Sequence, residues 1–168
     1  YMLCTMVFSA SSVSLEGKNL WIVRTAPVAT NEVLMAKRRM HILIALPAAL
    51  LPAAVSAMYV GGHALFAALC AGMFALVTAD VGLAENLRHP NLTWLNEMQA
   101  VKQGSAVLLT MLILMGLILV PALLYVLVLP DADTRVFLTA LAAVFFALDR
   151  LLLRWIKTRG AARFECLD

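Results

Sequence analysis

A long stretch without charged residues constrains this chain most. Residues 40–79 contain no Asp, Glu, Lys or Arg. One helical crossing of a bilayer needs roughly 20 apolar residues, so the stretch is long enough for two crossings and too long for an ordinary soluble core. Gly61-Gly62-His63 interrupts it where a helical hairpin needs a turn. A second uncharged stretch, 105–129, would form about 37 Å of helix at ~1.5 Å per residue. The sequence therefore predicts an integral membrane protein.

The composition agrees with a membrane protein. The chain is 63% hydrophobic and only 14% charged, whereas soluble domains are usually about 25% charged. A net charge of +3 is not interpreted as a nucleic-acid signal, because in membrane proteins the position of the positive charges matters more than their sum. Cys4, Cys70 and Cys166 lie far apart without metal-ligand spacing, which favours inert thiols in a reducing compartment.

We predict an all-α fold, a polytopic transmembrane helix bundle with four complete spans and the end of a fifth. The complete spans are residues 40–60, 64–84, 105–129 and 135–155. The last is interrupted by Asp149 and Arg150, but basic residues at both of its ends can anchor it by snorkelling. Residues 1–13 are apolar and too short to cross alone, so we interpret them as the end of a truncated span and the sequence as the C-terminal part of a longer protein.

The segments between the spans define the remaining organisation. Residues 14–39 form a long basic connection, 85–104 a second long connection and 156–168 a basic tail; the 40–84 and 105–155 segments are transmembrane hairpins. All Lys and Arg except Arg135 lie in these connections, in the tail or at the span ends beside them. The positive-inside rule then predicts that the connections and the C-terminus are cytosolic. The expected location is the bacterial cytoplasmic membrane, with several crossings.

The sequence shows no catalytic set, and we expect no catalytic, cofactor or metal site. No Gly-rich loop ends in Lys-Ser/Thr, so ATP cannot bind by that route. The three histidines are not paired, and His41 is interpreted as an interfacial residue at a membrane boundary. Asp80 and Asp149 are the ionisable residues within spans, which makes them functional candidates. Structural pairing or interfacial solvation is favoured over a proton or substrate role, because both lie near inner span ends.

Residues 14–39 contain the most informative pattern, two short helical pieces around a break. Helix is disfavoured just before Pro27. Thr30 is expected to cap the next helix, with Glu32 in its first turn. That helix should continue through Lys37 into the membrane, with Trp21 at headgroup level. The simplest interpretation is an interfacial elbow.

The same segment resembles a known family. The order Glu16-Gly17, Leu20, Pro27-Val28, Val33-Leu34 and Lys37 before a span resembles the cytosolic loop of type-2 ABC exporter permeases, which carries the coupling helix that contacts the ATPase subunit. The resemblance implies a coupling surface made by Glu16, Gly17, Leu20, Trp21, Pro27, Glu32 and Lys37. The segment before Glu16 departs from the pattern, because it is apolar and Ser-rich where many exporters carry charges.

A second block resembles a loop in one subgroup of ABC exporter permeases. There, a Pro-x-x-x-Trp-x-x-Glu stretch precedes Val-Lys-Gln and a span. The matching positions in the second connection are Pro90, Trp94, Glu97 and Lys102. The tail, with Arg163-Phe164-Glu165, is also similar to the end of that subgroup, so the resemblance covers most of residues 14–168.

The resemblance implies the C-terminal part of a permease subunit of an ABC exporter, working by alternating access. Its expected partners are a separate ATPase subunit, which would bind ATP, and a second permease copy, so this chain would not itself be an enzyme. One alternative is a membrane-embedded enzyme at the inner interface that uses Glu85, His89 and Glu97. Another is a structural or assembly membrane protein. Apolar spans lined with small residues fit many exported substrates and identify none of them.

Overall fold

The structure, a computed structural model, describes residues 8–92 and 104–167. Four long helices dominate this part of the chain: α4 (Thr30–Val60), α5 (His63–Arg88), α7 (Ser105–Val128) and α8 (Thr134–Trp155). Each is long and apolar enough to cross a membrane, and the described residues include no strand. The predicted all-α transmembrane bundle is confirmed.

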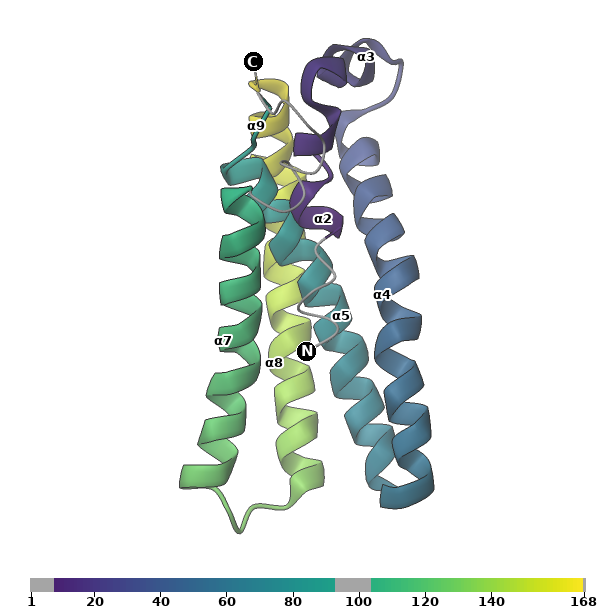
Figure 1. The fold of residues 1–168 in the computed structure, drawn as a ribbon, viewed down its shortest axis with the longest axis vertical. Helices are drawn as coiled ribbons and strands as arrows, with labels where there is room; N and C mark the ends of the chain where they lie inside the picture. The colour runs from purple at the N-terminus through teal and green to yellow at the C-terminus, as the bar shows by residue number, and fades with distance from the viewer. Residues whose placement is uncertain (1–7, 93–103, 168) are drawn as a thin grey trace.

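The four helices form two antiparallel hairpins that stand side by side (Figure 1). The first hairpin turns at Gly61, whose φ of 59° suits glycine because it has no Cβ. Both hairpin turns lie at one end of the bundle, while the C-terminus and the short helices lie at the other end. Prolines 47, 52 and 121 are accommodated inside α4 and α7, as neighbouring helices in lipid allow.

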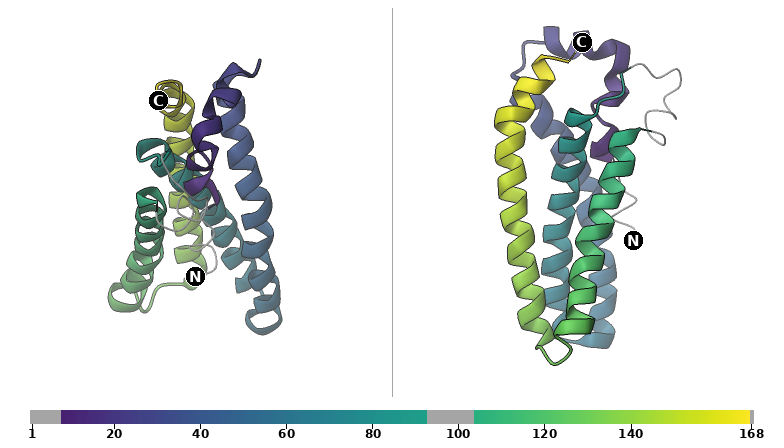
Figure 2. Two further views of the ribbon diagram at one scale, coloured as in Figure 1. Left: turned by 45° about the horizontal axis from the view of Figure 1, so that its top comes forward. Right: turned by 90° about the vertical axis from the view of Figure 1, so that its left-hand side faces the viewer.

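Helix α5 is the centre of the bundle. Half of its most apolar membrane-crossing window is buried, against 17% for each of the other three helices. Every residue from 77 to 87 is buried, because α4, α8 and the N-terminal segment surround this half of α5 (Figure 2). A helix buried on all sides can carry charge only where a neighbour supplies a partner.

A short N-terminal segment packs against α5 at the end away from the hairpin turns. It comprises α2 (Phe8–Ser11), the 3-10 helix η1 (Ser14–Asn19) and α3 (Leu20–Thr25). Helix α2 approaches α5 so closely that a Cβ placed on Gly82 would lie 2.3 Å from the Oγ of Ser9. Glycine is therefore required at position 82 for this contact.

Asn86 of α5 supports the irregular backbone that follows α2. The backbone N–H groups of Val13 and Ser14 donate to its Oδ1 at 3.0 and 2.9 Å. Its amide nitrogen donates to the carbonyl of Ala10. Buried backbone groups away from water need such partners, so one side chain makes the non-helical turn possible at this depth.

The connection between α3 and α4 agrees in part with the sequence analysis. Helix α3 ends at Thr25 and Ala26 is extended, with ψ of 141°, as expected before proline. The predicted cap is wrong: α4 follows Ala29 without a side-chain cap, and the Thr30 hydroxyl donates to Oε1 of Glu165 at 2.8 Å instead. The C-terminal helix α9 (Ala161–Glu165) presents this carboxylate, which competes for the hydroxyl. Glu32 does lie in the first turn.

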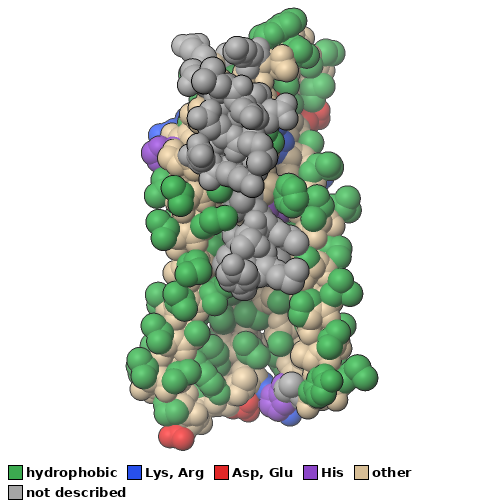
Figure 3. Space-filling model, viewed as in Figure 1, with side chains coloured by type: hydrophobic (Ala, Val, Ile, Leu, Met, Phe, Trp, Pro, Cys, Tyr) green, Lys and Arg blue, Asp and Glu red, His purple; other side chains and the backbone are tan. Residues whose placement is uncertain are grey.

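Beyond α8 the chain continues through a π-helical segment, η2 (Ile156–Gly160), into α9. A hydrophobic cluster joins this end of the chain to the N-terminal segment; its buried members are Val13, Leu20, Leu34, Leu83, Leu87, Ile156, Ala161 and Phe164. Hydrophobic side chains cover the visible flanks of the bundle (Figure 3). Such an apolar exterior is typical of a surface that faces lipid.

Candidate functional site

The inner face of α4 carries two polar residues into the bundle. The buried residues of this helix recur at helical spacing: Leu34, His41, Ala45, Ala49 and Ala53. Arg38 lies on the same face, since it is four residues after Leu34 and three before His41. The spacing therefore directs Arg38 and His41 toward α5 and α8, while the neighbouring Arg39 is exposed.

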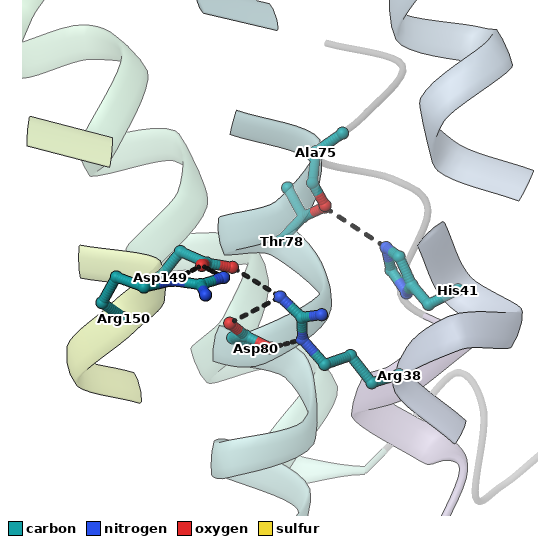
Figure 4. A network of polar contacts seen from close by, with 7 residues as sticks. All are labelled: Arg38, His41, Ala75, Thr78, Asp80, Asp149 and Arg150. Carbon is teal, nitrogen blue, oxygen red and sulfur yellow. Dashed lines mark hydrogen bonds and ion pairs between the residues drawn. The ribbon is translucent and has the colours of Figure 1, made fainter. Parts of the chain in front are cut away.

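Arg38 joins two buried carboxylates from two other spans. Its Nε donates to Oδ1 of Asp80 in α5 at 2.5 Å, and its Nη2 donates to Oδ1 of Asp149 in α8 at 2.5 Å. The same Nη2 lies 3.4 Å from Oδ2 of Asp80. Figure 4 shows the guanidinium between the two acids. One side chain thus ties α4, α5 and α8 together.

A second arginine completes the charge balance. Nε of Arg150 donates to Oδ2 of Asp149 at 2.8 Å, so both oxygens of that carboxylate are bound. The side chains of Asp80 and Asp149 are fully buried and that of Arg38 is 12% exposed. The side chain of Arg150 is 51% exposed and lies over the ring of Phe146, as expected of a snorkelling residue. We call these four residues the ion cluster.

The ion cluster is balanced, with two positive and two negative groups. Burying a charge away from water is costly unless it is paired and hydrogen-bonded. Removing Arg38 alone would leave two carboxylates next to each other in an apolar setting. The sequence analysis favoured structural pairing or interfacial solvation for Asp80 and Asp149 over a proton or substrate role, and the structure places both carboxylates in one ion-paired group.

His41 is part of a hydrogen-bond chain near the ion cluster. The backbone N–H of Ser9 donates to Nδ1 of His41 at 3.2 Å. Because Nδ1 accepts, the ring proton is on Nε2, which lies 3.3 Å from Oγ1 of Thr78. Thr78 in turn donates to the carbonyl of Ala75 at 2.7 Å. His41 is 1% exposed, so its interpretation as an interfacial residue is wrong; it is an internal link between α2, α4 and α5.

Two residues predicted for the coupling surface meet in an ion pair. Lys37 binds Oε1 of Glu16 and also donates to the carbonyl of Ser12 at 2.8 Å. Gly17 has φ of 42°, which makes glycine necessary where the chain turns beside this pair. These contacts fasten the N-terminal segment to the start of α4.

The other residues of the predicted coupling surface differ in their exposure. Trp21 is 63% exposed, and Pro27 and Glu32 are exposed. Leu20 is only 5% exposed, because it packs in the hydrophobic cluster beneath. It cannot form part of an exposed surface, which corrects the expectation for this residue.

The second predicted loop lies mostly beyond the described residues. Pro90 is half-buried just after α5, and Trp94, Glu97 and Lys102 fall outside the described ranges. Glu85 is bound by Arg88 at 2.7 Å, while His89 is exposed. Among residues 8–92 and 104–167, no group of His, Cys, Asp and Glu could hold a metal ion.

The sequence analysis missed the structural roles of three residues: Arg38, His41 and Asn86. The sequence analysis counted Arg38 only among the basic residues of the 14–39 connection. The signal for Arg38 and His41 was their place on the face marked by Leu34 and Ala45. No comparable signal exists for Asn86, whose partners are 72 to 76 residues away.

A cavity lies between the two hairpins, toward their turns. It has a volume of about 590 Å³ and is formed by all four long helices. Its walls are apolar and include Ala48, Pro52, Phe74, Leu117, Pro121 and Phe145. The cavity offers no cation to a phosphate group.

The fold and the ion cluster define a class: a polytopic helical membrane protein whose spans are joined by buried ion pairs. A family model described as "Putative ATP-binding cassette" matches residues 2–158. The chain therefore belongs to that family. No curated protein and no solved structure matches the chain.

This match corrects the expected function. The family description names an ATP-binding cassette, so the identification as the C-terminal part of a type-2 ABC exporter permease, paired with a separate ATPase subunit and a second permease copy, is wrong. The motifs behind it were short. Trp and Lys recur beside membrane spans for interfacial reasons that are independent of family.

Neither the cavity nor the ion cluster fits ATP. A triphosphate needs clustered backbone N–H groups and a cation. The cavity between the hairpins is apolar. Gly82 and Gly160 are occupied by helix contacts with Ser9 and Leu87, and the guanidinium of Arg38 is already bound by two carboxylates.

Proposed function

We propose that this chain is a membrane-integral part of an ATP-binding cassette protein, and that this protein binds ATP through a part other than the described bundle. The family match over residues 2–158 supports the link to such a protein. The four membrane-crossing helices support the membrane-integral role. The proposal makes no assignment of a transported substrate.

The ion cluster is the observation that carries the proposal. It joins α4, α5 and α8 (Figure 4), and α3 and α9 lie at the end of the bundle away from the hairpin turns (Figure 1). Charged groups within spans are rare and mark function or pairing between helices. Ion pairs at this position link the three spans, so a force applied at that end, such as one produced by ATP turnover, would move all three together.

We also infer that this end faces the cytosol of a bacterial cell, with the C-terminus inside. Among residues 8–92 and 104–167, all Lys and Arg except Arg135 lie toward this end or at the adjoining span ends, and an excess of positive charge marks the cytoplasmic side.

Two variants on one helix test the proposal. Arg38→Gln removes the ion pairs with Asp80 and Asp149, whereas Arg39→Gln removes an exposed charge one residue away. In membranes that contain the complete protein, we expect Arg38→Gln to reduce ATP hydrolysis several-fold and Arg39→Gln to leave it nearly unchanged. If Arg38→Gln protein that is correctly folded and inserted in the membrane supports the wild-type rate of ATP hydrolysis, the proposed role of the ion cluster is incorrect.

Photolabelling tests where ATP binds. Azido-ATP is cross-linked to the same membranes and the modified peptides are mapped by mass spectrometry. We expect no label within residues 8–92 or 104–167. ATP-protected labelling of the bundle would contradict the proposed separation of nucleotide and membrane roles.

A further inference from the structure

Two arginines lie against one tryptophan at the charged end of the bundle. Cζ of Arg88 lies 4.7 Å from the centroid of the Trp155 ring, and Cζ of Arg163 lies 5.9 Å from it. Arg88 is in the last turn of α5, Trp155 ends α8, and Arg163 is in α9. Three segments therefore bring these residues to one place.

The Trp155 ring is held by its packing. It lies against the hydrophobic cluster at this end of the chain. A Cβ on Gly160 would lie 3.6 Å from Cζ3 of Trp155 and 3.1 Å from Cδ1 of Leu87, so the ring, Leu87 and the π-helical segment are in close contact. The ring is thus a fixed platform on which cation–π contacts can orient the guanidinium groups.

The charge around this platform is positive. Arg88 binds Oε1 of Glu85 at 2.7 Å and remains 41% exposed. Arg163 is exposed, and the ion pairs found among the described residues do not include it. Three further exposed basic residues lie close to Trp155 in the sequence. Arg154 is in the last turn of α8, and Lys157 and Arg159 are in η2. Glu85 and the α9 residue Glu165 offset two of these five positive charges, so an excess of exposed positive charge remains.

The platform lies at the level of lipid headgroups. Arg135 and Trp155 are separated by one helix of ~1.5 Å rise per residue, which gives about 30 Å between them, the thickness of a bilayer hydrocarbon core. With Arg135 at one interface, Trp155 lies at the other. Tryptophan is enriched at this depth, where its ring contacts lipid and its arginine neighbours meet phosphate.

We propose that Arg88, Trp155 and Arg163 form a binding site for the phosphate of an anionic phospholipid headgroup. A guanidinium that stacks on an aromatic ring can present its N–H edge to phosphate oxygens, whose geometry it matches; on Arg88, Nη1 already binds Glu85 and the other N–H groups remain for phosphate. We assign the anion to a lipid rather than to a soluble ion because the platform lies at the level of the headgroup layer. This assignment does not depend on the proposed role in an ATP-binding cassette protein.

The test measures lipid binding to the purified full chain in phosphatidylcholine nanodiscs containing graded phosphatidylglycerol. Bound lipid is counted by native mass spectrometry after release from the disc. We expect preferential retention of phosphatidylglycerol, weakened roughly fivefold by each of Arg88→Gln and Arg163→Gln. Arg135→Gln at the opposite end is the matched control and should bind as the wild type does.

Glu85→Gln provides a test in the opposite direction. It removes the carboxylate that competes for Arg88, so phosphatidylglycerol should bind more tightly, an outcome that loss of structure would not produce. Equal retention of both lipids by the wild type, or unchanged binding in the Arg88→Gln/Arg163→Gln double variant, would overturn the site. Displacement of the lipid by inorganic phosphate or ATP would show a soluble-anion site instead and would equally overturn the lipid assignment.

Discussion

At the scale of single residues, polar side chains between the helices determine which segments stay together. Arg38 satisfies two carboxylates, His41 bridges Ser9 and Thr78, and Asn86 supports the turn after α2. Each has partners on more than one segment. In an apolar interior, an unpaired polar group costs more than the hydrogen bond contributes when it is made, so these residues specify one arrangement of the bundle.

Asn86 offers a direct test at this scale. Asn86→Leu leaves two backbone N–H groups and one carbonyl without their partner, and we expect a loss of about 2 kcal/mol or more in the free energy of unfolding. Asn86→Asp retains the acceptor for Val13 and Ser14 and should lose less. Unfolding by increasing SDS, followed by circular dichroism, measures both. Equal stability of Asn86→Leu and the wild type would show that the turn does not need this residue.

At the scale of elements, the position of α2 depends on the absence of a side chain on α5. The short helix lies over Gly82, with Ser9 Oγ and the Ala10 backbone nitrogen in the space that a Cβ would take. Four residues of helix have little stability alone, so close packing must hold α2 in place. The adjoining hydrogen bond from Ser9 to His41 then depends on the same contact.

Gly82→Ala should displace α2 and reduce stability by roughly 1–3 kcal/mol, because overpacking a close contact forces the backbone to shift. Ser9→Ala in the same protein should restore part of this loss, since it removes the nearest atom. Gly72→Ala, where a Cβ would meet nothing within 4 Å, is the control on the same helix. Thermal unfolding in detergent compares the variants. Additive losses from Ser9→Ala and Gly82→Ala would refute the contact.

The helices themselves follow from local sequence, whereas their contacts do not. Uncharged runs and Gly61-Gly62 predicted the first hairpin, since hydrophobic length and turn residues act locally. Asp80 and Asp149 could be singled out because charge within a span is conspicuous. Their common partner could not, since Arg38 is 42 and 111 residues away in sequence. Thr30 shows the same limit: its cap was predicted from its neighbours and was replaced by a bond to Glu165.

At the scale of the whole molecule, the bundle has two unlike ends. One end contains the two hairpin turns, around an apolar cavity of about 590 Å³. The other contains the ion cluster, the N-terminal segment and most of the basic residues. Central helix α5 connects them, with a buried half that carries Asp80 and Asn86. This asymmetry gives the molecule a defined orientation in a bilayer.

Cysteine labelling tests that orientation. In a background without Cys4, Cys70 and Cys166, a membrane-impermeant reagent applied to intact cells should label Asp131→Cys in the second hairpin turn. Asn91→Cys, at the charged end, should react only after the cells are opened. Labelling of Asn91→Cys in intact cells would reverse the proposed topology.

The ion cluster allows the most direct test of the account, through the stabilities of Arg38→Met and of the triple variant Arg38→Met/Asp80→Asn/Asp149→Asn. Removing one partner from a buried ion group costs roughly 3–5 kcal/mol, whereas neutralising all of its buried members costs much less. We predict a loss of that size for Arg38→Met, recovery of more than half of it in the triple variant, and little effect of Arg39→Met. If Arg38→Met is no less stable than Arg39→Met in SDS unfolding, Arg38 does not join α4, α5 and α8.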